Sequence, residues 1–174
     1  MMKVRFDVND APGRNALLRD VLPGALEPLR ADQTPKWGGM APQQMVEHLL
    51  WAFEASTGII EVPCPTPEER RSQVKPFLSN NRAMPISFES PLLKDGLPAL
   101  RFPTLSIATA ALIEAARTFL RLEESEPEVK RTHPLFGPLN AEGWSRLHFK
   151  HVVHHFLQFG LIEVEEVPTE KAHA

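Results

Sequence analysis

The chain has 174 residues, of which 43% are hydrophobic and 24% are charged, and its formal net charge is −3 at pH 7. This size and composition indicate one soluble domain with a single core, and the acidic balance argues against nucleic-acid binding, which leaves a basic footprint. No apolar run approaches the ~20 residues that span a bilayer, and we expect no signal peptide or membrane partner. Cys64 is the single cysteine, so no intrachain disulfide forms and a cytoplasmic location is expected.

The distribution of the 17 prolines predicts where helices lie, because a proline inside a helix removes a backbone donor and costs about 3 kcal/mol. A weak first helix is expected from about Arg14 to Arg30, with an interruption at Pro23-Gly24. Three longer proline-free windows follow, and each is expected to hold a helix: residues 43–62, 104–126 and 139–167.

The three windows carry helical signals of their own. In the first, Pro42 suits the first helical position, apolar residues recur at helical spacing and Gly58 is a natural stop. The second has an apolar stripe at the same spacing. The third begins after Asn140, a good N-cap, and ends near Gly160. Four such helices predict an all-α four-helix bundle that forms one domain over residues 1–174.

Residues 62–103 form a proline-rich insertion between the second and third helices. The segment holds eight prolines, and a structureless connection of this length is uncommon in a compact domain and often functional. A short helix is expected in EERRSQVKPFL (68–78) and an extended stretch in AMPISFESPL (83–92). We interpret the insertion as a cover over one end of the bundle and as a candidate lid.

The end of the chain has a different pattern from the helices. Ile162, Val164 and Val167 alternate with glutamates, which is typical of a strand. Residues 169–174 are expected to form a loose tail.

Four of the seven histidines lie in HFKHVVHHFLQFG, residues 148–160. Two imidazoles on one ion need their nitrogens roughly 3–3.5 Å apart, because each Zn–N bond is ~2.0–2.1 Å. On a helix this requires a spacing of three or four residues, so the feasible pairs are 148/151, 151/154 and 151/155. Every pair includes His151. Among them, 151/155 has the HxxxH spacing best known for binding one metal from a helix.

A helix supplies only two ligands, so a third must come from elsewhere. His48 is the candidate, because it lies on the predicted apolar face of the 43–62 helix. Three histidines would leave coordination positions open, which is the pattern of a catalytic metal. Other interpretations stay open at this point. A histidine on an apolar face is often a hydrogen-bonded core residue, and His148 and His154 are more typical of surrounding or surface residues than of ligands.

Three motifs together resemble the DinB-like (YfiT-like) superfamily: WGGMAPQQMVEHL at 37–49, HPLFG at 133–137 and W-x6-H-x3-H-x2-Q at 144–158. The resemblance covers residues 14–160 and is closest to a branch with HPxFG and HxxxHxxQFG signatures. It implies an up-down-down-up four-helix bundle that binds a divalent metal, often nickel or zinc, through three histidines. Carried over residue by residue, these are His48, His151 and His155, and Gln158 matches the glutamine that follows the last ligand.

The resemblance also implies a range of reactions, because members of this superfamily include thiol-dependent transferases and isomerases and metal-dependent hydrolases. A divalent ion on three neutral histidines lowers the pKa of bound water and deprotonates a coordinated thiol. We therefore expect a metal-dependent enzyme acting on a small molecule, either a small-thiol S-transferase or a hydrolase. A low-molecular-weight thiol is a candidate cosubstrate, and His154 and His148 are candidate catalytic acid–base residues.

Two alternatives do not require catalysis. In one, the metal holds a ligand without turnover. In the other, the chain is a metal-free helical bundle with a structural or interaction role. Many relatives in the resembled superfamily form dimers, so a homodimer is a further expectation.

Overall fold

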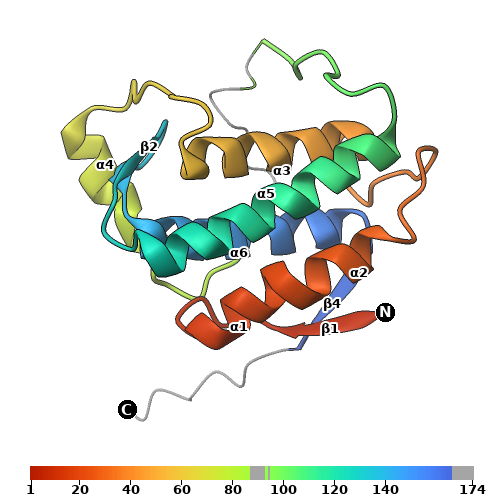
Figure 1. Cartoon of the computed structure of the whole chain (residues 1–174), viewed down its shortest axis with the longest axis horizontal. Helices are drawn as coiled ribbons and strands as arrows, with labels where there is room; N and C mark the ends of the chain where they lie inside the picture. The colour runs from red at the N-terminus through yellow and green to blue at the C-terminus, as the bar shows by residue number, and fades with distance from the viewer. Residues whose placement is uncertain (87–92, 94, 166–174) are drawn as a thin grey trace.

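Long helices dominate the computed structural model, which describes residues 1–86, 93 and 95–165 (Figure 1). Three of these helices are α3 (Pro42–Thr57), α5 (Leu105–Ser125) and α6 (Ala141–Gln158). A helical run near the N-terminus joins α1 (Ala11–Ala16), the π-helical turn η1 (Leu17–Val21) and α2 (Leu22–Leu26). Helix α3 packs along α5, and α6 contacts both of them. None of the described helices is long and apolar enough to cross a membrane.

The three long helices confirm those expected in the proline-free windows. Pro42 occupies the first position of α3, and Gly58 ends the helix in the left-handed region at φ 79°. The side chain of Thr104 caps α5, and that of Asn140 caps α6, each by accepting a hydrogen bond from a backbone N–H three residues on. Local capping chemistry therefore sets where these helices begin.

The first helical run passes through Pro23 without the predicted interruption. In the wider π-helical turn before it, the Leu22 N–H donates to the Leu17 carbonyl, five residues back. This shifted pattern accommodates Pro23, which has no N–H to donate. The run then ends at Leu26 rather than at Arg30.

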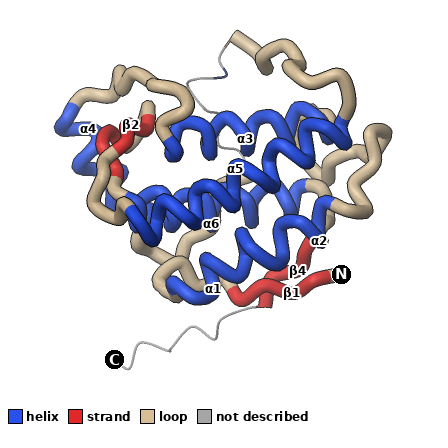
Figure 2. Tube along the Cα trace, in the orientation of Figure 1, coloured by secondary structure: helices blue, strands red, loops and turns tan. Residues whose placement is uncertain are grey.

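Two small sheets accompany the helices in the described part of the chain (Figure 2). Strand β1 (Met2–Arg5) pairs in parallel with β4 (Ile162–Glu165), and β2 (Arg131–His133) pairs antiparallel with β3 (Gly137–Leu139). The prediction of an all-α, up-down-down-up four-helix bundle is therefore wrong, because the fold mixes helices with strands. Strands β1, β2 and β3 have only three or four residues, too few to show the two-residue alternation by which strands are recognised in a sequence.

Of the predicted strand signals, the one at the end of the chain is confirmed in part. Ile162 and Val164 lie on β4, next to the N-terminal strand. Val167 and the expected tail at 169–174 lie outside the described residues.

The insertion between α3 and α5 is partly helical. The short helix expected at 68–78 is confirmed as α4 (Glu68–Val74) and the 3₁₀ turn η2 (Lys75–Leu78). Within the expected extended stretch, residues 83–86 form no strand, and 87–92 lie outside the described residues. At the far end of the insertion, the Glu47 carboxylate on α3 accepts from the backbone N–H groups of Arg101 and Phe102 at 2.7 and 3.2 Å. These bonds hold the insertion against α3, and its function as a lid stays a prediction.

The core lies where the long helices meet. Each helix contributes apolar side chains that are almost fully buried, and burial of one such side chain stabilises the fold by ~1.5–3 kcal/mol. They include Met45, Leu49 and Phe53 of α3, Leu112 and Phe119 of α5, and Val152 and Phe156 of α6. This packing fixes how α3 faces α6 and so positions the histidines of both helices.

Candidate metal centre

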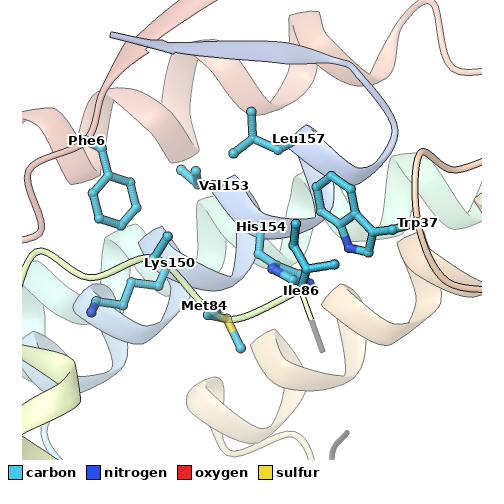
Figure 3. Close-up of a pocket in the computed structure, with 9 residues that line it drawn as sticks. Phe6, Trp37, Met84, Ile86, Lys150, Val153, His154 and Leu157 are labelled. Atoms are coloured by element: carbon cyan, nitrogen blue, oxygen red, sulfur yellow. The ribbon is translucent and has the colours of Figure 1, made fainter. Parts of the chain in front are cut away.

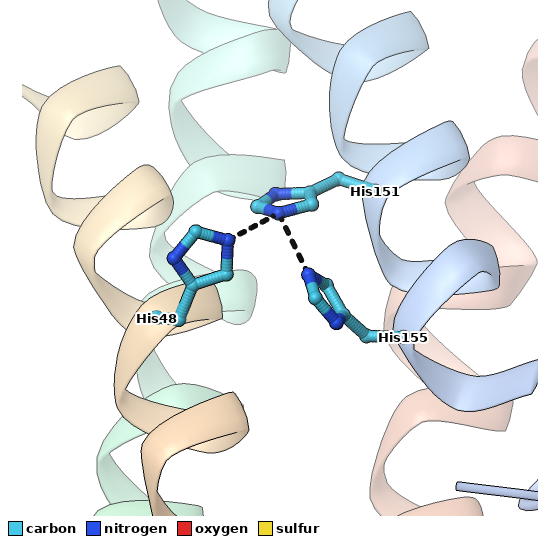
Figure 4. Close-up of side chains that lie close together, drawn as sticks. All are labelled: His48, His151 and His155. Carbon is cyan, nitrogen blue, oxygen red and sulfur yellow. Dashed lines mark hydrogen bonds between the residues drawn. The ribbon is translucent and has the colours of Figure 1, made fainter. Parts of the chain in front are cut away.

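Helices α3 and α6 place three histidine rings against one another (Figure 4). The Nε2 atom of His151 lies 2.8 Å from Nε2 of His48 and 3.2 Å from Nε2 of His155. One nitrogen from each ring lies within 4.8 Å of the other two. His151 and His155 are one turn apart on α6, and His48 faces them from α3. The structure thus brings together the three residues that the sequence analysis selects as ligands.

Hydrogen bonds alone do not satisfy these three nitrogens. A neutral imidazole nitrogen has one in-plane position, which holds either a proton or a lone pair. The Nε2 atom of His151 can therefore make one good hydrogen bond, to His48 or to His155, but not both. A cation that accepts a lone pair from each ring satisfies all three at once. Two nitrogens bound to one such ion lie roughly 3–3.5 Å apart, close to the separations of His151 Nε2 from the other two rings.

Burial favours the neutral form of the three rings, which is the form that binds a metal. His155 is buried, and His48 and His151 are half-buried. Desolvation, reinforced by the neighbouring histidines, lowers the pKa of His48 to about 4 and that of His155 to about 3. The same causes hold the pKa of His151 well below its usual value of 6.5. The lone pairs are therefore available at neutral pH.

Gln158 fixes the proton of the His155 ring. The Nε2 atom of Gln158 donates to the Trp37 carbonyl at 2.9 Å, which leaves its Oε1 to accept from His155 Nδ1 at 2.8 Å. With the proton on Nδ1, the lone pair of His155 lies on Nε2, the atom that faces the other two rings. The glutamine matched by the family resemblance therefore controls the tautomer of a candidate ligand.

The loop before α3 supplies a partner that sequence reasoning missed. Besides the Trp37 carbonyl, the Lys36 N–H donates to the Gln158 carbonyl at 2.7 Å. Gly38 follows at φ 73°, and a Cβ there would lie 3.1 Å from Gln158 Nε2. The tryptophan–glycine–glycine motif carried a signal for this contact, because glycine adopts a left-handed backbone and admits a close neighbour.

His148, a predicted catalytic candidate, lies in the core. Its ring is fully buried, stacks on Phe53 with centroids 3.9 Å apart and lies 5.5 Å from the Trp144 ring. The Ser56 hydroxyl donates to the Phe53 carbonyl, so its oxygen accepts from His148 Nε2 at 2.8 Å. Burial lowers the pKa of His148 to about 3. This placement argues against a catalytic role, because no atom of the ring is exposed to a substrate.

His154, the other catalytic candidate, is half-buried beside the three rings. Its ring packs edge-on against His155, with centroids 5.0 Å apart, and lies 5.7 Å from the Trp37 ring. It also lines a cavity together with Met84 and Ile86. A small molecule in that cavity would contact His154, although the catalytic role itself stays a prediction.

The HPLFG motif builds a turn. The Nδ1 atom of His133 accepts from the N–H groups of Leu135 and Phe136 at 3.1 and 3.3 Å, which closes the connection between β2 and β3. Gly137 then adopts φ 74°, and the His133 ring lies against Trp144 of α6. This histidine is part of the architecture around α6 and lies outside the three-ring cluster.

The arrangement defines a candidate three-histidine metal centre between two helices of a mixed fold. Comparison of the chain with protein-family models, with curated proteins and with solved structures found no match. The resemblance to the DinB-like superfamily therefore rests on the motifs themselves.

Proposed function

We propose that His48, His151 and His155 bind one divalent metal ion, zinc or nickel, and that the protein uses it to act on a small molecule. The observation that supports this proposal is the convergence of three Nε2 atoms, two pairs of which lie 2.8 and 3.2 Å apart. Neutral imidazole is a preferred ligand of both metals. Three protein ligands leave positions for a water or a substrate, as in catalytic zinc sites.

The reaction we propose is S-transfer from a small thiol or hydrolysis. When bound, the metal supplies the activation of a thiol or a water. The chain itself contributes the orientation of the ligands, because Gln158 holds the His155 proton on Nδ1. His154 adjoins this cluster through His155 and is the candidate to hold or move a proton of the substrate. Binding of a ligand without turnover is the alternative, and it is favoured by one observation: the cavity that His154 lines does not include the three ligands.

Other expectations from the sequence stay proposals. They are membership of the DinB-like superfamily, which rests on the motifs, a cytoplasmic location, which rests on the single cysteine, and a homodimer, which rests on the resemblance.

The test is metal content. Protein purified without chelator and then dialysed against zinc should contain about one ion per chain by elemental analysis, and His151→Ala should contain none. His154→Ala is the matched control, because it removes a neighbouring histidine of the same helix and should keep the ion. If His151→Ala retained the wild-type content, the proposal would be refuted.

A second measurement separates the two reactions. Cobalt-substituted protein should change its visible absorption when a small thiol is added, because a thiolate entering the coordination sphere alters the spectrum. A response to a panel of low-molecular-weight thiols supports S-transfer. The absence of any response, with cobalt bound, favours hydrolysis or simple binding.

A further inference from the structure

A cavity of about 160 Å³ lies against α6 (Figure 3). One of its lining residues, His154, packs against His155 of the three-histidine cluster. Helix α6 contributes four of its lining residues, at spacings of three and four: Lys150, Val153, His154 and Leu157. The opposite walls come from Phe6, from Trp37 and from the insertion at residues 83, 84 and 86. Segments far apart in the sequence thus meet around one small space.

The insertion wall is held in place by a buried lysine. The ammonium of Lys150 donates to the Phe77 and Arg82 carbonyls and to Asn80 Oδ1, and it lies 3.8 Å from the centroid of the Phe77 ring. An ammonium has three donors, so all three are matched by oxygens of the insertion. Lys150 therefore ties the start of this wall to α6, and its own charge is directed to the insertion rather than to a guest in the cavity.

The remaining lining is mostly apolar, as Phe6, Met84 and Leu157 illustrate. It includes two polar side-chain groups, the ring of His154 and the indole N–H of Trp37, for which the described residues provide no hydrogen-bond partner. A hydrogen bond with the Met84 backbone engages one nitrogen of the His154 ring. A neutral imidazole that donates from one nitrogen accepts at the other. The polar group that suits the other nitrogen is therefore a donor.

The volume limits the size of a guest. An apolar cavity of ~150 Å³ in another protein holds benzene, so a space of about 160 Å³ suits a single six-membered ring or an alkyl group of similar bulk. A drug-sized molecule needs ~300 Å³ or more.

We propose that this cavity binds a small apolar molecule of one-ring size that carries a hydroxyl or thiol donor, and that His154 accepts the hydrogen bond from that donor. As a binding site the cavity stands by itself. Calling its guest the substrate rests on the proposed function, because the link is the edge-on packing of the His154 ring against His155.

The experiment uses phenol and toluene as probes, which differ by the single donor. Both are titrated into metal-free protein, treated with chelator, and followed by amide and methyl NMR shifts. We expect both to shift the signals of Val153, Met84 and Leu157, and phenol to bind about tenfold more tightly because of the hydrogen bond. His154→Phe should remove the preference for phenol and leave toluene binding within a factor of about two.

A filling variant tests the location. Leu157→Phe should weaken both probes at least tenfold, and Ala83→Leu, on the opposite wall, provides the same test if the first variant does not fold. Shifts confined to residues away from the cavity, or equal binding to both filled variants and the wild type, would overturn the proposal. So would an equal affinity for phenol and toluene in the wild type, since His154 would then accept no bond.

Repeating the phenol titration with cobalt-loaded protein keeps the two proposals distinct. Binding of phenol to a protein that takes up no cobalt upholds the cavity and removes the proposed function. Uptake of cobalt without phenol binding does the reverse. If phenol binds and also perturbs the cobalt spectrum, the cavity is the place from which the substrate meets the metal.

Discussion

Two groups of histidines lie on or against helix α6, and they differ in what their ring nitrogens face. His48, His151 and His155 face one another through Nε2. His133 and His148 each have a partner of another kind, backbone N–H groups for the first and a serine hydroxyl for the second. The pKa is lowered by burial in all five. A lowered pKa therefore does not by itself indicate a metal site, and what distinguishes the first group is that its Nε2 atoms face one another.

The largest expected effect that separates the two groups is stabilisation by zinc. An ion that binds only the folded state adds RT ln(1 + [L]/Kd) to the free energy of unfolding, about 4 kcal/mol at a thousandfold excess over Kd. Urea unfolding with and without saturating zinc measures this gain. The wild type and the control His133→Asn should show it, and His48→Ala should not. A gain of the same size in His48→Ala would place the zinc elsewhere.

The next effect is a loss of folding stability in acid, which we expect from His133 in the second group. Burial lowers the pKa of His133 in the folded state to about 4, below the usual 6.5. As pH falls below 6.5 the unfolded chain therefore takes up a proton that the folded chain does not, and stability is lost until about pH 4. The full loss for this one residue is about 3 kcal/mol. Free energies of unfolding measured from pH 7 to pH 4 should fall less steeply in His133→Asn than in the wild type.

Asparagine is the matched replacement for that test, since its side-chain oxygen can accept from the same backbone N–H groups without titrating. The two proteins should then differ little at pH 7, where the histidine is neutral in both states. Parallel stability curves over the whole range would mean that His133 is protonated in the folded protein.

The sequence predicted the helices better than the class of fold. Proline placement and capping residues act locally, so α3, α5 and α6 were found close to their observed ends. Among the described strands, β4 alone lies in a segment whose alternation predicted a strand, and its partner β1 lies near the other end of the chain. Strands β1, β2 and β3 are too short to show a pattern of their own, and this is why the all-α prediction was wrong.

In the candidate site, too, local features could be predicted from the sequence and tertiary contacts could not. Helical spacing alone selects His151 as the pivot, because geometry within one helix can be read from the sequence. Choosing His48 and His155 also needed the family resemblance. The separate role of His148 could not be found in this way, since its position on the helix resembles that of a ligand. Its burial between Phe53 and Trp144 is a tertiary fact.

Removal of the His148 ring tests whether this residue contributes to core packing and not to zinc binding. His148→Ala leaves a cavity beside Phe53 and deprives Ser56 of its donor, and it should cost about 2–3 kcal/mol in metal-free protein. His148→Phe keeps the volume and should lose less. Urea unfolding gives both values, and zinc content should stay at the wild-type level in each variant. Loss of zinc from a folded His148→Phe protein would show that His148 contributes to zinc binding.

The smallest effect concerns Gln158, which touches the ligand group without belonging to it. Gln158→Leu removes the acceptor that holds the His155 proton on Nδ1, so part of the folded protein adopts the tautomer with Nε2 protonated. Loss of such an orienting partner typically weakens metal affinity 10–100-fold, equivalent to about 1.4–2.7 kcal/mol. Competition with a chromophoric zinc chelator measures this affinity.

Gln33→Leu is the matched control for Gln158→Leu. Gln33 also joins the loop before α3 to the end of α6, by donating to the Phe159 carbonyl at 2.6 Å, but contacts no ligand. If both variants lost affinity equally, the contribution of Gln158 would be to the loop contact and not to the tautomer of His155.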